Sequence, residues 1–245
     1  MLSKSQISQG YIHTKLLFFV MLLFIRADGS RIIGGRDAAP HSLPYMASVQ
    51  LQGRHLCGGA LVREDFVLTA AHCETRGIPT VVLGVDSLTG TEPTKQQFLV
   101  VKSFPHPDYD GHKNDIMLLK VRTTAVLFFL LLISFSAEPE GPSVSSSSGD
   151  LSETWQEVNV TTLPQMICKR RWGQVPITQS MVCGVGSHSL QGFCSGDSGG
   201  PLVCDGDAAG VISFSGRRCG DPQTPDVYTR ISSFRAWIQR VLNDN

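Results

Sequence analysis

Short apolar or alternating stretches, separated by glycine, proline and aspartate, recur along the chain from Pro44 onward. Stretches of this length and pattern are typical of β-strands. The first group of predicted strands covers Met46–Leu51, Phe66–Thr69, Thr80–Leu83, Gln97–Phe104 and Ile116–Val121. A second group follows residue 150, at Glu157–Thr162, Gly210–Phe214 and Asp226–Arg230. The pattern predicts an all-β protein of the sandwich or barrel type, and it does not by itself separate one barrel from two.

The end of the chain has a different period. Four apolar residues have the spacing i, i+3, i+4 and i+7 that places them on one face of a helix: Phe234, Trp237, Ile238 and Val241. Ser232 or Ser233 can cap the first turn of such a helix. We therefore expect one C-terminal helix that packs on the β core.

The segment Thr123–Gly149 breaks the strand pattern. It joins an apolar run, Ala125 to Phe135, to a tract rich in proline, serine and glycine, Ala137 to Gly149. Neither half has the pattern of an ordinary β-hairpin, and the second half has the composition of a linker.

The first residues have the features of a signal peptide. Lys4 and Lys15 precede the apolar run Leu16–Ile25, and small residues follow that run. The alternative is a membrane anchor, but this run falls well short of the ~20 residues that span a bilayer. We assign residues 1–29 to a signal peptide and expect a protein that is secreted, either extracellular or held in a secretory granule, with no membrane span.

Composition supports an oxidising compartment and narrows the class of partner. The 245 residues are 42% hydrophobic and 17% charged, which suits a globular chain, and the seven cysteines form no C-x-x-C pair. A disulfide framework with one cysteine left over is therefore favoured over a zinc site. Removal of residues 1–31 would leave 17 basic and 20 acidic residues. A net charge of −3 argues against binding to nucleic acid or anionic membranes, although the triplet at 169–171 is basic.

Three separate segments carry candidate chemistry. The run Gly196–Pro201 places Ser198 between glycines, and a sharp turn there can direct the N–H groups of Gly196 and Ser198 at one oxyanion. His72 follows an apolar strand and can serve as the base, while Asp115 precedes an apolar strand and can orient the imidazole. Each segment alone also fits an ordinary turn or a bystander histidine.

Together and in this order, the three segments resemble the chymotrypsin-like serine peptidases, and the resemblance covers Ile32–Val121 and Gly149–Asn245. It implies a double antiparallel β-barrel, with the catalytic residues His72, Asp115 and Ser198 in the cleft between the barrels. It also implies a serine endopeptidase that acts through an acyl-enzyme and needs no cofactor or metal. Its expected partners are protein or peptide substrates and serpin-type inhibitors, and the expected state is a monomer.

The same resemblance identifies an activation site at Arg31-Ile32-Ile33-Gly34-Gly35. Residues 30–31 are then a short propeptide and residues 32–245 the peptidase domain. Cleavage after Arg31 would free the amino group of Ile32, which is expected to pair with Asp197 and shape the oxyanion pocket. A charge buried there is tolerable only when it is paired.

Family resemblance further implies the disulfides Cys57–Cys73, Cys168–Cys183 and Cys194–Cys219, and leaves Cys204 unpaired. In relatives the partner of this cysteine lies in the first strand of the second barrel, and no segment here resembles that strand. Two interpretations remain open. Either a foreign stretch leaves the barrel without this strand, as in a splice variant or an erroneous gene model, or Val126–Phe135 supplies a substitute strand.

Substrate choice in the family depends on a pocket whose lining corresponds here to Gly192, Phe193, Ser213–Gly216 and Asp226. Gly192 stands where trypsin-like relatives have an acid, which by itself favours small aliphatic substrates. Several segments, however, resemble a neutrophil member of the family that prefers arginine. A guanidinium can donate hydrogen bonds at the rim to Ser195, Ser215 and backbone carbonyls. We therefore expect cleavage after arginine.

Asn159-Val160-Thr161 is an N-glycosylation sequon in a predicted strand, where packing can either hide or expose it. Two alternatives to an active protease remain: a catalytically inactive isoform, and a non-enzymatic granule or binding protein on the same scaffold.

Overall fold

The structure is a computed structural model that describes residues 32–122, 143–147, 154–188 and 190–245. The predicted signal peptide, Arg31 and the run Val126–Phe135 lie outside the described residues. The first half of the chain forms β1 (Arg36–Asp37), β2 (Met46–Leu51), β3 (Arg54–Arg63), β4 (Phe66–Thr69), β5 (Thr80–Leu83), β6 (Gln96–Pro105) and β7 (Met117–Val121). The second half forms β8 (Ser143–Ser147), β9 (Gln156–Leu163), β10 (Met181–Gly186), β11 (Pro201–Cys204), β12 (Asp207–Phe214) and β13 (Asp226–Arg230), with the helices α2 (Gln165–Trp172) and α3 (Arg235–Asp244).

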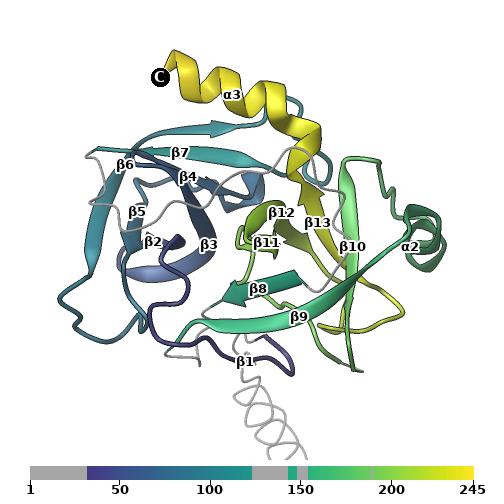
Figure 1. Cartoon of the computed structure of the whole chain (residues 1–245). Coiled ribbons are helices and arrows are strands. Elements are labelled where there is room, and N and C mark those ends of the chain that lie inside the picture. The colour runs from purple at the N-terminus through teal and green to yellow at the C-terminus, as the bar shows by residue number, and fades with distance from the viewer. Residues whose placement is uncertain (1–31, 123–142, 148–153, 189) are drawn as a thin grey trace, which may run out of the picture.

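Strands β2 to β7 close into a six-stranded antiparallel barrel with the order β2-β3-β4-β7-β6-β5 (Figure 1). The predicted strand at 66–69 is central to it, because all four of its side chains are buried and Val67 pairs with Leu119 of β7. Aliphatic and aromatic side chains from all six strands fill the interior. The first barrel therefore has the architecture that the apolar pattern predicts.

The remaining strands form a second sheet with the order β1-β9-β10-β13-β12-β11-β8. Because β8 pairs with β9 as well as with β11, this sheet curls back on itself beside the first barrel (Figure 1). A compact cluster that includes Ile32, Phe193, Leu202 and Tyr228 fills its interior. The double-barrel fold class is confirmed.

Strand β8 occupies the place for which the sequence offers no obvious strand. Its five residues pair with β9 from Ser143↔Val160 to Ser147↔Gln156, and Val144 pairs with Val203 of β11. These pairings use backbone N–H and C=O groups on β9 and β11 that would otherwise need another partner. The interpretation that the strand is absent is therefore wrong. The replacement strand comes from the serine-rich tract that we assigned to a linker.

Helix α3 begins later than its predicted cap. The chain passes through a 3₁₀ turn at Ile231–Phe234, the helix starts at Arg235, and no side chain caps it, so the expectation of a Ser232 or Ser233 cap is wrong. The predicted apolar face is right, because Phe234 and Ile238 are buried against the first barrel. Figure 1 shows α3 lying across the top of that barrel. No helix among the described residues is long and apolar enough to cross a membrane.

Candidate active site

The carboxyl group of Asp115 lies where the two barrels meet. Its Oδ1 accepts the backbone N–H of His72 at 2.9 Å, and its Oδ2 is 2.7 Å from Nδ1 of the same residue. From the second barrel, Ser213 donates its hydroxyl to Oδ2 at 2.6 Å, and Thr229 donates its hydroxyl to the Asp115 backbone carbonyl at 2.8 Å. Burial raises the pKa of Asp115, but the hydrogen bonds and the charge of His72 outweigh it, and the pKa lies below its ordinary value.

His72 sits in a 3₁₀ turn, Ala71–Cys73, that follows the buried strand β4. The disulfide Cys57–Cys73 ties this turn to β3. Because Asp115 engages Nδ1 of the ring, the Nε2 atom is left to act on another group. The side chain is 32% exposed, so it remains accessible from solvent.

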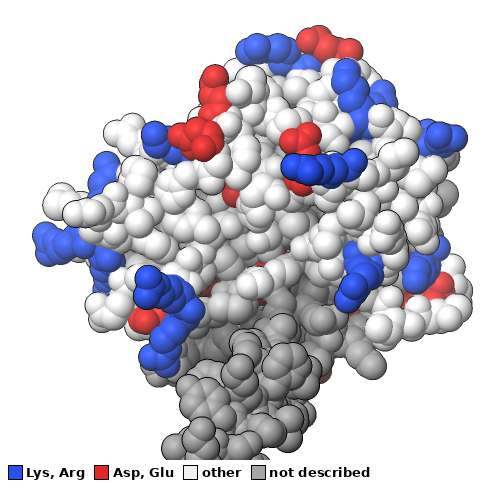
Figure 2. Space-filling view, turned by 180° about the vertical axis from the view of Figure 1, so that it is seen from behind, with Lys and Arg blue, Asp and Glu red and all other residues white. Residues whose placement is uncertain are grey.

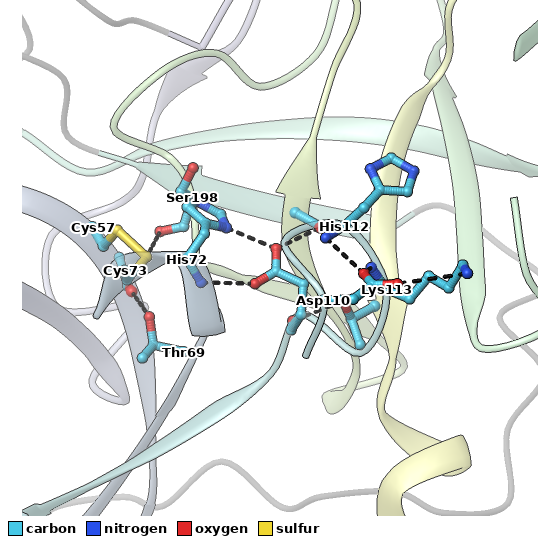
Figure 3. Close-up of polar contacts among 12 residues, drawn as sticks. Cys57, Thr69, His72, Cys73, Asp110, His112, Lys113 and Ser198 are labelled. Atoms are coloured by element: carbon cyan, nitrogen blue, oxygen red, sulfur yellow. Dashed lines mark hydrogen bonds and ion pairs between the residues drawn. A yellow bond between two sulfur atoms is a disulfide. The ribbon is translucent and has the colours of Figure 1, made fainter. Parts of the chain in front are cut away.

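Ser198 lies in the loop that joins β10 to β11, and its backbone is fixed from the first barrel. Gly58 donates its N–H to the Ser198 carbonyl at 2.8 Å, and that carbonyl also lies 3.9 Å from the Sγ of Cys73, the neighbour of His72. Figure 3 draws Ser198 together with His72 and the Cys57–Cys73 bridge. The three predicted catalytic residues are thus brought to one place by segments that lie far apart in the sequence.

Two glycines give the serine loop its shape. Gly196 and Gly199 have φ values of +90° and +82°, which L-residues with a side chain rarely adopt. Within the described residues, no acceptor receives a hydrogen bond from the backbone N–H groups of Gly196 and Ser198. These are the two donors expected to stabilise an oxyanion, and they are available to an incoming group.

Sequence reasoning missed the contribution of His55, a partly buried residue of β3. Its Nε2 lies 3.0 Å from the carbonyl of Gly196, and its Nδ1 lies 2.8 Å from the hydroxyl of Ser48. Burial lowers the pKa of His55, which favours a neutral ring that donates from Nε2 and accepts at Nδ1. His55 therefore holds the peptide that follows Gly196. The only signal for it would have been a strand at 54–63, which the pattern did not predict.

Asp197 is fully buried and only half satisfied. Its Oδ2 accepts the backbone N–H of Cys194 at 2.8 Å, while its Oδ1 has no hydrogen-bond partner among the described residues. Burial raises its pKa well above the ordinary value. Ile32 is also buried in the second barrel, and Ile33 exchanges two backbone hydrogen bonds with Gly192. The start of the described chain is thus anchored beside the predicted substrate pocket.

A buried carboxyl group, that of Asp226, lies among the residues expected to line that pocket. Asp226 accepts hydrogen bonds from the Ser215 hydroxyl at 2.6 Å and from the Phe193 backbone N–H at 2.9 Å. A Cβ at Gly192 would lie 2.1 Å from Asp226 Oδ2, so the absence of a side chain there makes room for this acid. The Phe193 ring packs edge-on against Tyr228, whereas Ser195 is exposed. Ser213 donates its hydroxyl to Asp115.

All three expected disulfides are present, and Cys204 is free and buried. Among the residues that the structure describes, two groups are compact enough to be considered for a metal: Cys57, His72 and Cys73, and His41, Asp86 and Glu92. Both cysteines of the first group are oxidised. In the second, both oxygens of Glu92 accept backbone N–H groups and Asp86 pairs with His41. Neither set is free to surround a cation.

The residues outside the site carry charges of both signs. On the face seen in Figure 2, basic and acidic side chains lie in small groups, in several places next to each other, around a largely uncharged centre. The basic triplet at 169–171 belongs to α2, where Arg171 donates to the Pro222 carbonyl. This contact ties Arg171 to the loop that contains Pro222.

Comparison with known proteins places the chain in a family. The family described as Trypsin matches residues 32–238. Serine protease 57 of Mus musculus is 42% identical over 87% of this chain and 82% of its own length, and that of Homo sapiens is 43% identical over the same shares. Mast cell protease 3 of Ovis aries is 41% identical over 92% of this chain and 95% of its own length.

A solved structure agrees with these relatives. Neuropsin, described as a serine protease expressed in the limbic system of mouse brain, superimposes with a TM-score of 0.80 at 33% identity. The match covers 85% of this chain and 99% of that one. The chain belongs to the trypsin family of chymotrypsin-like proteases and is a serine-type endopeptidase.

Proposed function

We propose that the protein is a secreted endopeptidase in which His72 deprotonates Ser198 and Asp115 orients and stabilises the imidazolium. The observation that carries this proposal is the alignment of the His72–Asp115 pair, held at 2.7 Å and supported by hydroxyl groups from the other barrel. The hydroxyl of Ser198 attacks the scissile carbonyl, and His72 then returns the proton to the leaving amine. A water molecule then attacks the acyl-enzyme, with His72 again taking and returning the proton, and this step frees Ser198.

The tetrahedral intermediates carry a negative oxygen, which the N–H groups of Gly196 and Ser198 would stabilise. The positive φ at Gly196 and the hydrogen bond from His55 to its carbonyl support this assignment. Neither N–H group donates a hydrogen bond to an acceptor among the described residues, so no such bond has to be broken when the oxyanion forms.

We further propose that the protein is made as a zymogen and activated by cleavage after Arg31. The unpartnered and fully buried Oδ1 of Asp197 supports this step, because an isolated carboxylate in such a place is costly and an ammonium is its natural partner. Ile32 is itself buried in the second barrel, and its new amino group would supply this partner. Activation would thus lower the pKa of Asp197 and secure the loop that carries Gly196.

Cleavage after arginine is the specificity that we propose. Phe193 is buried, so we expect a long side chain to stay at the rim of the pocket and to find acceptors in the exposed Ser195 and in the hydroxyl of Ser215. A guanidinium offers five donors in a plane and suits such a rim better than a small aliphatic group does. An assay with a mixed peptide library would overturn this specificity if valine or alanine were preferred.

Residues 1–29 would direct the chain to the secretory pathway, where Asn159 can be glycosylated. Both Asn159 and Thr161 of the sequon have exposed side chains on β9, so packing does not hide the acceptor. Serpin-type inhibitors and a monomeric state complete the proposal. Treatment with a glycosidase would test the glycosylation of Asn159, and light scattering would test the monomeric state.

The direct test is to cleave the purified chain after Arg31 and react it with an arginine phosphonate that traps active serine proteases. Labelling of Ser198, absent in Ser198→Ala and in the uncleaved chain, is the expected result. A compact, ordered product that resists labelling would favour the non-enzymatic binding role. An aggregated product would favour the inactive isoform.

A further inference from the structure

Helix α2 and the loop between β12 and β13 form a basic surface at the edge of the second barrel. Figure 1 shows the two elements side by side, and Arg171 joins them by donating to the Pro222 carbonyl at 2.7 Å. The indole of Trp172 donates to the Pro225 carbonyl at 3.0 Å. Residues 165–172 and 214–224 contain one acidic residue, Asp221, and five basic ones, all exposed: Lys169, Arg170, Arg171, Arg217 and Arg218.

The five cations of this basic surface lack counter-charges. None of them lies within ion-pair distance of a carboxylate in the part of the chain that the structure describes. The one acid nearby, Asp221, uses its Oδ1 to accept the Gln223 backbone N–H at 2.9 Å. Elsewhere in the described chain, four basic side chains do have an acidic partner: Arg36, Arg63, Lys113 and Lys120. The charge of the basic surface is therefore left for a partner from outside.

An apolar side chain lies among these cations. Met166 is 71% exposed, and it precedes Lys169 and Arg170 by three and four positions, so the three side chains share one face of α2. Methionine and arginine are both enriched at protein–protein interfaces relative to the rest of the surface. An acidic polypeptide segment can offer carboxylates to the cations and an aliphatic group to the methionine. A sulfated saccharide offers only the charge.

A short series of contacts connects the basic surface to the catalytic residues. Ser213 donates its hydroxyl to Asp115, and the next residue, Phe214, packs edge-on against Trp172 with ring centroids 5.2 Å apart. Trp172 is the last residue of α2, and along the backbone only two residues separate Phe214 from Arg217. The rings of Phe214 and Trp172 are thus the layer between the catalytic pair and the basic surface.

We propose that the basic surface is an exosite that binds an acidic segment of the protein substrate, on the N-terminal side of the cut bond. This inference rests on the proposed protease function and deepens it by naming a substrate class. With the residue before the cut bond in the pocket at 213–216, the preceding residues extend away from Ser198 and pass Arg217 and Arg218 on the way to α2. An extended segment rises about 3.3 Å per residue, so several residues separate the acidic segment from the cut bond.

Such an exosite acts on substrate capture and leaves the chemical step unchanged. Its contacts are equally strong in the bound substrate and in the transition state, so they lower KM without raising kcat. Screening by salt weakens attraction between exposed charges, because the Debye length falls from about 10 Å at 0.1 M to about 3 Å at 1 M. The gain should therefore decline as salt is added.

The experiment compares two peptides on the cleaved chain. Both have the same residues around a cut bond that follows arginine, and a flexible linker joins this part to an N-terminal segment of glutamates with one leucine, or to its glutamine counterpart. At low salt, kcat/KM should be about 3–10-fold higher for the acidic peptide, through KM. The same acidic segment placed after the cut bond should give no gain.

Matched variants locate the effect. Lys169→Gln/Arg170→Gln should remove most of the gain and leave the neutral peptide unaffected. Lys95→Gln/Arg240→Gln is the control, because it removes two exposed charges from a loop of the first barrel and from α3, neither of which is paired in the described chain. The control should keep the full gain. Met166→Gln should reduce the gain only for a segment that contains the leucine.

A binding measurement separates this inference from the proposed function. Fluorescence anisotropy on the Ser198→Ala variant follows the labelled acidic segment alone, without a cut bond, and binding should weaken with salt and on loss of Lys169 and Arg170. Equal kcat/KM for the two peptides, a gain that survives in Lys169→Gln/Arg170→Gln, or binding of a heparin fragment but not of the acidic segment would overturn the inference. Absence of turnover with both peptides would instead defeat the protease function, and the anisotropy would still decide the role of the basic surface.

Discussion

The register of β8 can be tested by a disulfide. Val144 pairs with Val203, so position 143 lies directly across from the free, buried Cys204. Opposed positions of an antiparallel pair have Cα atoms about 4.5–5.5 Å apart, and disulfides form over roughly 4.4–6.8 Å. We therefore expect Ser143→Cys to form a disulfide with Cys204.

The gain in stability follows from the loop that the new bond would close. Positions 143 and 204 are separated by about 60 residues, and the chain-entropy relation gives about 4 kcal/mol of stabilisation for a loop of this length at 25 °C. Engineered bonds often deliver less, because native geometry has to adjust. A gain of about 2–4 kcal/mol in the free energy of unfolding is the expected range.

The assay compares urea unfolding of Ser143→Cys with that of Ser143→Ala under oxidising conditions, together with a free-thiol count and peptide mapping. Val144→Cys serves as the register control, because it is opposite Val203 and belongs to the other face of the sheet. Loss of the Cys204 thiol in Ser143→Cys but not in Val144→Cys would support the register. A bond that forms in Val144→Cys instead, or a folded Ser143→Cys that keeps two free thiols, would refute it.

Three further substitutions test the site. Ser213→Ala removes the hydroxyl that Asp115 accepts at 2.6 Å, so steady-state kinetics should show kcat reduced by about 10–100-fold with little change in KM. Gly199→Ala places a Cβ 2.5 Å from a carbonyl oxygen of β3, and urea titration should show a loss of more than about 3 kcal/mol; Gly206→Ala, also at positive φ but in open space, should lose only about 1 kcal/mol. Burial raises the pKa of Asp226 to about 7, so its contribution to stability is present at low pH and is lost as pH rises through that value. Between about pH 4 and about pH 8, the free energy of unfolding of the natural chain should therefore fall by up to about 4 kcal/mol more than that of Asp226→Asn. Urea unfolding at each pH measures this difference.

Strands with a continuous apolar run were predictable from the sequence, and those that depend on tertiary pairing were not. The strand at 66–69 is buried on both faces, so hydrophobicity alone marks it. Strand β3 contains the pair Gly58-Gly59, which weakens the strand signal, yet Gly58 has to lack a side chain because Gly200 packs within 3.1 Å of where a Cβ would be. Strand β8 has almost no apolar signal, and its pairing partners on both sides place it.

Helix α2 was missed for a related reason. Its sequence ends in three basic residues and a tryptophan and has no continuous apolar stripe. The helix is held by the bond from Cys168 to Cys183 and by the indole of Trp172, which donates to the Pro225 carbonyl at 3.0 Å. Both partners lie outside the helix, so its own sequence does not reveal these contacts.

The nucleophile, the base and the acid of the site could be predicted from the sequence, because each lies in a local motif with characteristic neighbouring residues. What the sequence could not provide was the partner of each group across the barrels. The bond from His55 to the Gly196 carbonyl joins strand β3 to the serine loop, and no local pattern connects the two. The hydrogen bonds that give Asp226 its place under Gly192 likewise come from separate loops.

Asp115 receives its support from two separately formed halves of the molecule. Its histidine partner belongs to the N-terminal half, whereas Ser213 and Thr229 reach it from the C-terminal half. An N-terminal half expressed by itself would contain both the imidazole and the carboxylate, yet the carboxylate would lack one of its three hydrogen bonds and the Asp115 backbone carbonyl would lack its bond from Thr229. Catalytic activity therefore depends on how well the two halves are docked. A substitution anywhere in the C-terminal half that loosens this docking would abolish activity before it unfolds the protein.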